Sequence, residues 1–505
     1  MHKNTEEAGV QMSMNPLVES LQKPATDFTR QDIIRYINEH GIQMLNFRYV
    51  GGDGKLKTLN FVVTDREYLE SVLATGERVD GSSLFDFVES DSSDLYVIPR
   101  FSTAFRNPFA EIPTLDILCS FYNRDGEPLE SSPEYILRKA SRLFYKQTGL
   151  QFKAMGELEY YIFSEHGDLY PPEAQRGYHA SEPFTNFEWI RTEAMRLIAQ
   201  CGGRIKYGHS EVGSFSDGPI HYEQHEIEFI PVEPVEAVEQ LLLAKWVLRM
   251  LGRQHNVTVS FAPKITPGQA GSGLHIHFLA ERDGQNIMAD EEGITREARK
   301  MIAGVLAKAA SLTAFGNTIP TSYLRLVPHQ EAPVKVCWGK ENRSALVRVP
   351  LGWNTKTNMV KHANPQEMDP VPRIGGKQTV EFRVADGSAN LYLLMAGLIQ
   401  AAAEGLNASD SLERADVLFV DVNIFAGSHR ELHDRLESLP ASCAESADLL
   451  ERDREFYIAD GVFPAGLVDS TIKKLRSYGD ASLRERLEND RGALRELVGT
   501  YIHTM

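Results

Sequence analysis

Four short segments of the chain each carry two charged or imidazole side chains that are two residues apart. The pairs are Glu157 and Glu159 in MGELEYYIF, Glu226 and Glu228 in EQHEIEF, His275 and His277 in GSGLHIHF, and Glu381 and Arg383 in TVEFRV. Apolar residues fill the alternate positions, which is the pattern of a half-buried β-strand. Because side chains on a strand alternate between its two faces, each pair is expected to point to one side.

The residue types at these positions indicate a site that binds cations. The solvated face of a sheet would explain any single pair, but such a face is normally rich in Lys, Thr and Ser. These positions hold almost only Glu, His and Arg. Clustered carboxylates repel one another unless a positive group lies between them. A ligand set dominated by oxygen, with one imidazole, favours Mg²⁺ or Mn²⁺ over Zn²⁺.

The segment SYLRLVPHQEAPVKVCWGKENRSALVRVP adds Arg325, Arg343 and Arg348. Guanidinium groups suit bidentate contacts with carboxylates and phosphates. Metal ions together with arginines are what phosphoryl transfer requires, because charge spreads over three oxygens in its transition state. The sequence contains no GxxxxGK[ST] loop, no GxGxxG after a strand, no GxSxG and no HExxH. The motifs therefore predict a phosphate-using metalloenzyme without a P-loop.

Composition excludes several other classes of protein. The 505 residues carry a net charge of −17 with a pI near 5.4, which argues against a nucleic-acid or anionic-membrane partner. No run of 18 or more apolar residues occurs, and the first 28 residues lack the features of a secretory signal. The four cysteines are scattered, with no CxxC. We expect a cytoplasmic protein with four buried thiols.

The order of predicted elements indicates an α+β protein with a polar leader over residues 1–30, a small domain over 31–126 and a large domain over 127–505. In the small domain QDIIRYINEHG predicts a helix, and MLNFRYVGGDGKLKTLNFVVT predicts a β-hairpin around a Gly-Gly-Asp-Gly turn. A turn followed by a Ser-Pro helix start places the boundary near residue 127. Beyond residue 152 β-type runs alternate with amphipathic helices, and the last hundred residues are expected to be mainly helical.

Ten motifs, in order from about residue 31 to about residue 475, resemble the bacterial and archaeal glutamine synthetase family. They are VDGSSLFDF, SSDLYVIP, MGELEYYIF, HSEV, QHEIEF, GSGLHIHF, RLVPHQEAP, ENRSALVRVP, VEFRVADGSANLY and DREFYIADGVF. The resemblance implies a β-grasp-like N-terminal domain and a catalytic domain whose antiparallel sheet, surrounded by helices, lines a funnel-shaped site. It also implies a homo-oligomer, typically a dodecamer of two stacked hexameric rings, with active sites between subunits.

The resemblance also implies roles for individual residues, with ATP as co-substrate and two or three Mg²⁺ or Mn²⁺ ions in each active site. One metal ion is expected to bind Glu159, Glu211 and Glu226, and a second is expected to bind Glu157, His275 and Glu381. Glutamate and ammonium are expected to contact Ser83, Tyr178, Gly271, Arg325 and Arg383. ATP is expected to contact His277, Arg343 and Arg348, and the catalytic groups are expected to be Asp80, Glu331 and Arg343.

The activity that this resemblance implies is the ATP-dependent ligation of ammonia to the γ-carboxylate of L-glutamate through γ-glutamyl phosphate. Asp80 of a neighbouring subunit would take a proton from ammonium. Glu331 would shield the intermediate from water. Two alternatives stay open: a γ-glutamyl ligase for another amine, and a non-catalytic ring-forming scaffold or sensor.

Four positions depart from the family's usual pattern. Ala270 replaces an asparagine that contacts glutamate, while Pro231, Leu279 and Thr379 replace an aromatic residue, a serine and an arginine on the nucleotide side. None of these changes removes an expected metal ligand. Some subfamilies are controlled by adenylylation of a tyrosine in a loop that corresponds to residues 421–456. That span contains no tyrosine, so we expect this control to be absent.

Overall fold

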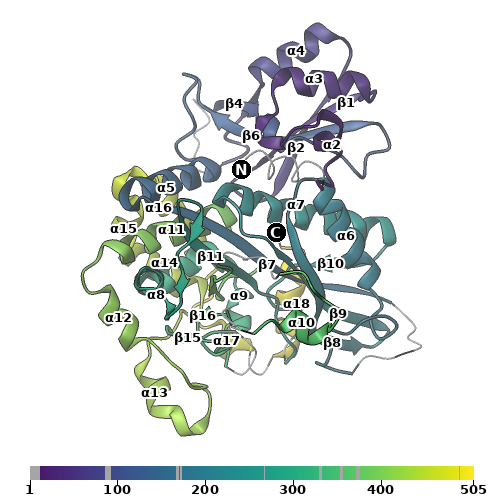
Figure 1. Ribbon diagram of the computed structural model, residues 1–505. Helices are drawn as coiled ribbons and strands as arrows, with labels where there is room; N and C mark the ends of the chain where they lie inside the picture. Colours follow the sequence, from purple (N-terminus) through teal and green to yellow (C-terminus); the bar gives the residue numbers. More distant parts are fainter. Residues whose placement is uncertain are drawn as a thin grey trace.

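The N-terminal part of the chain folds around a mixed six-stranded sheet (Figure 1). A computed structural model describes residues 12–85, 93–165, 170, 173–266, 268–328, 332–352, 357–370, 376–487 and 490–504. The strands are β1 (Met44–Val50), β2 (Leu56–Val62), β3 (Glu77–Asp80), β4 (Asp94–Pro99), β5 (Phe105–Arg106) and β6 (Thr114–Tyr122), and the helices are α2 (Pro16–Leu21), α3 (Arg30–Glu39) and α4 (Arg66–Thr75). The order is β2-β1-β6-β4-β3, with β5 beside β6. Strand β3 is therefore an edge strand.

Local sequence explains the first elements of this domain. Helix α3 begins at a capping box, in which Thr29 and Asp32 each accept a hydrogen bond from the other's backbone N–H. Strands β1 and β2 form the predicted antiparallel hairpin around the glycine-rich turn. Ile33 of α3 and Phe47 of β1 lie in the buried core between the helices and the sheet.

A second, nine-stranded sheet forms the centre of the large domain. Its order is β15-β16-β17-β11-β7-β9-β8, with β10 beside β7 and β12 beside β11. The strands are β7 (Gln151–Glu165), β8 (Ile205–Asp217), β9 (Ile220–Phe229), β10 (Thr258–Ser260), β11 (Leu274–Arg282), β12 (Gln285–Asn286), β15 (Trp338–Lys340), β16 (Val347–Val349) and β17 (Val380–Phe382), and β13 (Ala289–Asp290) and β14 (Gly293–Ile294) form a separate pair. Strands β8, β9, β7, β11 and β17 are antiparallel to their neighbours.

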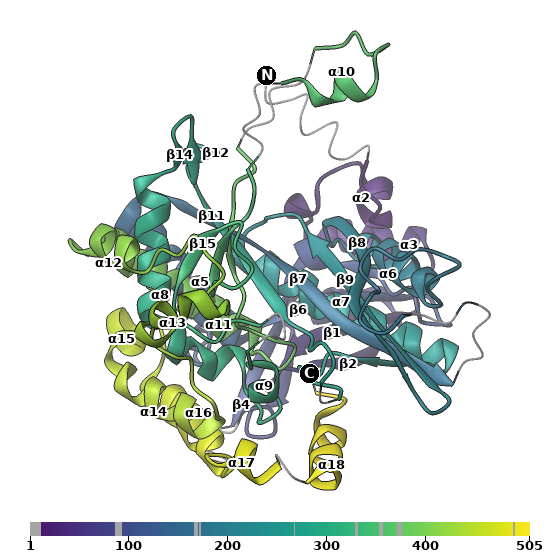
Figure 2. The same cartoon turned by 90° about the horizontal axis from the view of Figure 1, so that it is seen from below.

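Helices cover the sheet and make up most of the C-terminal part, as Figures 1 and 2 show. They are α5 (Pro133–Thr148), α6 (Glu188–Gln200), α7 (Pro234–His255), α8 (Arg296–Gly316), α9 (Ser322–Arg325), α10 (Met359–Ala363), α11 (Leu391–Asn407), α12 (Ser411–Val417), α13 (Arg430–Arg435), α14 (Cys443–Arg452), α15 (Arg454–Ile458), α16 (Ala465–Ser477), α17 (Leu483–Leu487) and α18 (Arg491–Tyr501). The α+β fold class and the helical C-terminal part are thus confirmed. The boundaries drawn at residues 30 and 126 stay predictions.

One face of the large sheet is apolar and packs against helices. Leu158, Ile227 and Ile276 lie on neighbouring strands and are fully buried in the main core. Gly156 lets α7 lie directly on β7, because a Cβ atom at this position would come within 2.7 Å of Leu241. Since side chains alternate along a strand, the opposite face of the same strands carries the charged pairs.

The described residues include no single helix that is long and apolar enough to cross a membrane. The bent pair α11 and α12, which meet at 109°, passes a test of length and hydropathy only when taken together. Helix α11 is buried along most of its length. All four cysteines are free and buried, as predicted.

Candidate active site

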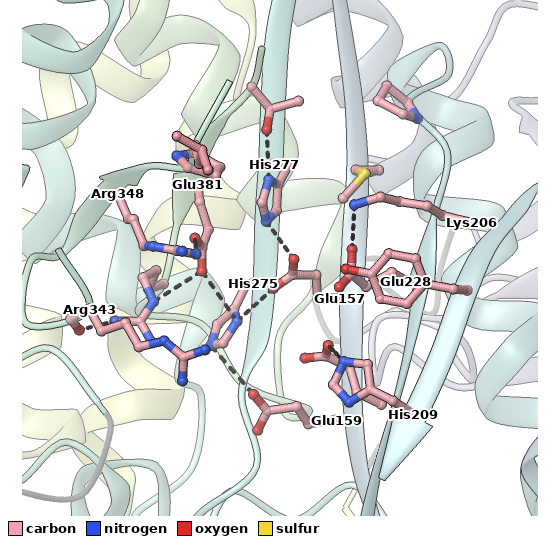
Figure 3. A pocket seen from close by; sticks show the side chains of 18 of the residues that line it. Glu157, Glu159, Lys206, His209, Glu228, His275, His277, Arg343, Arg348 and Glu381 are labelled. Atoms are coloured by element: carbon pink, nitrogen blue, oxygen red, sulfur yellow. Dashed lines mark hydrogen bonds and ion pairs between the residues drawn. The ribbon is translucent and has the colours of Figure 1, made fainter. Parts of the chain in front are cut away.

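A cavity of about 890 Å³ opens on the polar face of the large sheet (Figure 3). Its floor consists of side chains from β7, β8, β9 and β11, and the segments around β16 and β17 supply one wall. Thirteen of the predicted site residues line it: Glu157, Glu159, Tyr178, Glu211, Glu226, Gly271, His275, His277, Arg325, Arg343, Arg348, Glu381 and Arg383.

The strand register explains why these residues meet. Between β8 and β9, Tyr207 pairs with Glu228 and His209 pairs with Glu226. Between β9 and β7, Glu228 pairs with Glu157 and Glu226 pairs with Glu159. Glu157 also pairs with His275 on β11, and His277 on β11 pairs with Glu381 on β17. Directly paired residues lie on the same face of a sheet. Polar side chains from five strands therefore lie on one face of the sheet and face the same cavity.

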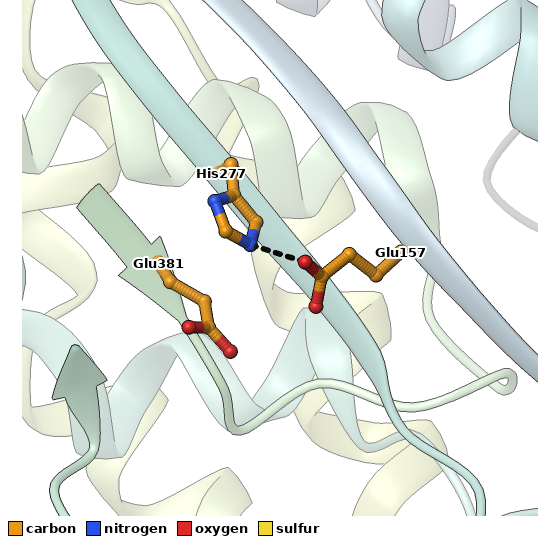
Figure 4. Close-up of side chains that lie close together, drawn as sticks. All are labelled: Glu157, His277 and Glu381. Atoms are coloured by element: carbon orange, nitrogen blue, oxygen red, sulfur yellow. Dashed lines mark ion pairs between the residues drawn. The ribbon is translucent and has the colours of Figure 1, made fainter. Parts of the chain in front are cut away.

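The first cluster joins two imidazoles to two carboxylates. His277 Nε2 lies 2.8 Å from Glu157 Oε1 (Figure 4). Its Nδ1 lies 2.9 Å from Thr379 Oγ1. His275 Nδ1 lies 3.0 Å from the other oxygen of Glu157 and 3.5 Å from Glu381 Oε1. Arg348 and Arg383 both donate to Glu381, at 2.9 and 3.0 Å.

The second cluster lies on β8 and β9. His209 Nε2 is 3.1 Å from Glu226 Oε1, and its Nδ1 is 3.8 Å from Glu211 Oε1. Glu159, opposite Glu226, has one carboxylate oxygen that accepts from the backbone N–H of Gly273 at 2.7 Å. These are buried or half-buried groups, so their charges interact strongly.

The pKa values show that nearby positive groups offset the negative charge of some of these carboxylates and not of others. Burial and the charges of Glu157, Glu159 and other neighbouring carboxylates raise the pKa of Glu226 well above its usual value of 4.5. Burial also raises the pKa of Glu157, but the two histidines outweigh it and hold that pKa well below 4.5. The site thus has an excess of negative charge on the β8–β9 side, which a divalent cation would neutralise.

Among the residues that the structure describes, three sets of donors are close enough to hold a metal ion. They are Glu157, His277 and Glu381; Glu157, Glu226 and His275; and His209, Glu211 and Glu226, with the donor atoms of each set within 4.8 Å of one another. Oxygen-rich sets with one imidazole fit Mg²⁺ or Mn²⁺. The six predicted ligands lie in the same cavity, but this grouping differs from the predicted one: Glu159 belongs to no set and His277 joins one.

His209 was missed by the sequence analysis, although it belongs to the quoted motif HSEV. It lies two residues before Glu211, at the same spacing as the four charged pairs. A search for charged or imidazole residues two positions apart would have found His209. Lys206, which donates to Glu228 at 2.6 Å, was missed as well.

The arginine side of the cavity contains one guanidinium group without a carboxylate partner. Arg325 is buried, and its side chain donates to the backbone carbonyls of Val384 and Ala385 at 2.8 and 3.2 Å. Within the described part of the chain it forms no ion pair. A buried guanidinium group that lines a cavity in this way is suited to a carboxylate ligand.

Glycines and an aromatic ring complete the walls. A Cβ atom at Gly271 would lie 2.5 Å from the carbonyl oxygen of Pro263 and 2.9 Å from Arg325 Cγ, so only glycine fits there. Tyr178 is half exposed, and Arg343 lies over its ring at 5.8 Å. The four departures from the family pattern, Ala270, Pro231, Leu279 and Thr379, all line this cavity.

Two predicted residues that the structure describes do not line the cavity. Asp80 and Ser83 lie at the end of edge strand β3, where the Ser83 hydroxyl donates to Asp80 at 2.6 Å. Hydrogen bonds from Ser83, Ser82 and Ser93 hold the pKa of Asp80 well below its usual value. Glu331 lies outside the described residues.

A β-grasp-type domain joined to a sheet whose polar face gathers carboxylates, imidazoles and arginines is typical of enzymes that use metal ions and phosphate. The family models agree with this class. "Glutamine synthetase, beta-Grasp domain" matches residues 41–124 and "Glutamine synthetase, catalytic domain" matches residues 130–477. The chain belongs to the glutamine synthetase family, and is thus a ligase of nitrogen metabolism. Members of this family use ATP and divalent metals, bind glutamate and ammonia, and typically form oligomers.

Individual relatives are distant. The chain is 30% identical to the glutamine synthetase of Thermotoga maritima, over 84% of this chain and 90% of that one. It is 27% identical to that of Aquifex aeolicus, over 90% and 96%. Among solved structures, Plasmodium falciparum glutamine synthetase superimposes with a TM-score of 0.72 at 20% identity, over 91% and 98%. A GmaS/ADP complex gives 0.71 at 18% identity, over 90% and 99%. At this level of identity the structures show the fold alone.

Proposed function

We propose that the chain joins ammonia to the γ-carboxylate of L-glutamate, with ATP, through γ-glutamyl phosphate. One observation carries this proposal: the register of four strands gathers Glu157, Glu226, His275 and Glu381 in one cavity beside buried Arg325. These groups supply a place for cations, a place for a carboxylate and arginines for a phosphoryl group. Glutamate–ammonia ligation needs all three.

Two groups of ligands hold divalent cations in this proposal. We place one ion with Glu157, His275 and Glu381. We place the other with Glu211, Glu226 and Glu159, whose carboxylate would turn from the N–H of Gly273, and His209 lies 3.1 Å from Glu226. Bound Mg²⁺ or Mn²⁺ would neutralise the carboxylates and polarise the terminal phosphate of ATP. His277 lines the same cavity; burial lowers its pKa, but Glu157 outweighs this and raises it, so a positively charged imidazole would lie near the phosphates of ATP.

Arginines orient the two reacting groups. Arg325 binds a carboxylate of glutamate, because it is buried in the cavity wall without an acidic partner among the described residues. Arg383 lies beside it, and Gly271 keeps the wall close enough for the contact. Arg343 and Arg348 stabilise the negative charge of the transferred phosphoryl group.

The ammonium pocket is completed by a second subunit in this proposal. Asp80 and Ser83 lie on an exposed turn at the sheet edge, away from the cavity of their own chain, and Asp80 is ionised. An ionised carboxylate can bind ammonium and accept its proton. The arrangement requires a homo-oligomer, and we propose two stacked hexameric rings in which Asp80 faces Tyr178 of the adjacent subunit.

The test is the formation of glutamine from glutamate, ammonium and ATP with Mg²⁺, followed by mass spectrometry, with γ-glutamyl hydroxamate formation as a second assay. We expect one phosphate released for each glutamine formed. Binding of ATP without either product would contradict the proposal and favour a non-catalytic scaffold.

A second candidate is a γ-glutamyl ligase for a larger amine. A side cavity of about 420 Å³ shares Glu211 and Gln224 with the main cavity and is also lined by Gly177, Ser214 and Glu223. It offers room for an amine substituent next to the ammonium pocket. Phosphate release with methylamine or a polyamine, but not with ammonium, would favour this candidate over glutamate–ammonia ligation.

A further inference from the structure

One buried glutamine contacts both a proposed metal ligand and the glycine-rich loop beside the proposed glutamate site. Gln224 lies on β9, two residues before Glu226, and therefore on the same face of that strand. It lines the active-site cavity and is 2% exposed. Its hydrogen bonds therefore bear on the groups that would hold substrate and metal.

The orientation of the Gln224 amide follows from its partners. Its Oε1 accepts from the backbone N–H of Gly213 at 3.0 Å, and its Nε2 donates to the carbonyl oxygen of Gly271 at 3.1 Å. A backbone N–H can only donate and a carbonyl oxygen can only accept, so these partners fix which end of the amide is which. A Cβ atom at Gly213 would lie 2.6 Å from Gln224 Oε1, so only glycine brings the β8 backbone this close.

The nitrogen of this amide has more acceptors than hydrogens. Besides Gly271, Nε2 lies 3.1 Å from Glu159 Oε2 and 3.3 Å from Ser272 Oγ. An amide NH₂ group has two N–H bonds, so the three acceptors must share them. Glu159 Oε2 also accepts from the N–H of Gly273 at 2.7 Å, while Glu159 Oε1 lies 3.7 Å from His275 Nε2 (Figure 3). One carboxylate oxygen of Glu159 is thus held by both the amide and the loop.

The loop of residues 269–273 lies directly against both proposed subsites. A Cβ atom at Gly271 would lie 2.9 Å from Arg325 Cγ. A Cβ atom at Gly273 would lie 2.5 Å from Arg325 Nη2 and 2.7 Å from His275 Nε2. The loop backbone therefore packs on the guanidinium group that is proposed to bind glutamate and on a proposed metal ligand. A shift of this loop would change both subsites.

We propose that Gln224 is a positioning residue that couples the binding of the cation to the binding of glutamate, an inference that rests on the proposed function. When Glu159 turns to the cation it leaves the amide, and both N–H bonds then remain for Gly271 and Ser272. The loop is thereby held more firmly beside Arg325, in the position that binds glutamate. Because coupling between two sites is reciprocal, bound glutamate raises the affinity for the cation by the same factor.

Binding measurements test this coupling without catalysis. The metal-free, full-length protein is titrated by calorimetry with Mn²⁺, with and without L-glutamate, and with L-glutamate, with and without Mn²⁺. In the parent we expect each ligand to raise the affinity for the other about fivefold or more. Gln224→Met has a similar length but no amide, and Gln224→Glu keeps the acceptor for Gly213 but, when ionised, has no N–H to donate. In both variants we expect the coupling to fall below about twofold.

A matched control separates coupling from a general effect on packing. Gln400→Met changes another buried glutamine, on α11 and outside the cavity lining, and should keep the coupling of the parent. A merely structural role of Gln224 would weaken the binding of each ligand but leave the coupling factor unchanged. Unchanged coupling in both Gln224 variants, or a parent that binds both ligands without coupling, would overturn the inference and leave the proposed function standing. A parent that binds neither Mn²⁺ nor glutamate would contradict the proposed function, and this inference with it.

Discussion

Two carboxylates of the N-terminal domain, Asp32 and Asp80, and one of the large cavity, Glu226, are held in opposite ways. Asp32 and Asp80 accept hydrogen bonds from hydroxyl, amine or backbone groups, which lower their pKa values. Glu226 lies among other carboxylates, and burial with their charges raises its pKa. A carboxylate that accepts hydrogen bonds from neighbouring groups stabilises its own turn or helix start. One that is crowded by like charges requires a ligand from outside the chain.

The comparison is tested most strongly by neutralising one of the clustered carboxylates of the cavity. Glu157→Gln removes the group that contacts both His275 and His277. We expect ligase activity to fall about 1,000-fold or more, because the charge of the reacting phosphates loses its stabilisation. The measurement is glutamine formation at saturating substrates. Glu193→Gln, an exposed change on α6, should be as active as the parent.

A second test concerns the exposed Asp80. Asp80→Asn should keep the turn, since the asparagine Oδ1 still accepts from Ser82 and its NH2 group can donate to the Ser83 hydroxyl. Loss of the base should lower activity about 100-fold. Hybrid oligomers of Asp80→Asn and Glu157→Gln subunits should regain activity, because one intact site forms between the two variants. Hybrids as inactive as each parent variant would contradict a site shared between subunits.

A smaller effect is expected at the arginine that has no acidic partner. Arg325→Lys keeps the charge but loses the fork that reaches a carboxylate. The KM for glutamate should rise about tenfold or more, with a smaller change in the KM for ATP. Steady-state kinetics with both substrates measure this difference. Arg196→Lys, on the outer surface of α6, is the control; an equal rise in both constants would argue against a glutamate contact.

The smallest effect should come from the satisfied carboxylate of the N-terminal domain. Asp32 completes the capping box of α3 and contacts Lys23 at 2.6 Å. Burial raises its pKa, but Lys23 and Thr29 outweigh this and lower it to about 2. A lowered pKa means that the stabilisation is present above the usual 3.8 and is lost as pH falls through about 2.

Asp32→Asn should therefore destabilise the domain by about 0.5–1 kcal/mol near pH 7. The difference from the parent should shrink as the pH is lowered toward 3. Thermal unfolding at several pH values measures it. A difference that grows in acid would show that the lysine contact is not the source of the stability.

The residues of the cavity could be predicted because the alternation of side chains along a strand depends only on the local sequence. The spacing of Glu157 and Glu159, or of His275 and His277, is enough to place each pair on one face. The order of the strands, with β7 between β9 and β11, is set by tertiary packing and could not be derived from those segments. The residue types of the segments indicated a common cation site, and the resemblance to a family assigned individual residues to it.

Two results depended on structure that periodicity does not encode. His209 meets Glu226 through the register of β8 with β9, which shifts at Ser210–Ser214. Because of that irregularity, the long segment between Glu211 and Glu226 could not be aligned by counting. The position of Asp80 relative to a cavity depends on a second chain, so neither the sequence pattern nor a single chain determines it.

The account depends on the cavity being a site for divalent cations, and titration of the metal-free protein with Mn²⁺ tests it most directly. Calorimetry together with the electron paramagnetic resonance of free Mn²⁺ counts the ions bound by each chain. We predict at least two ions per chain in the parent and at least one fewer in Glu226→Gln. Binding of no ions by the parent, or an unchanged number and affinity in Glu226→Gln, would contradict the account.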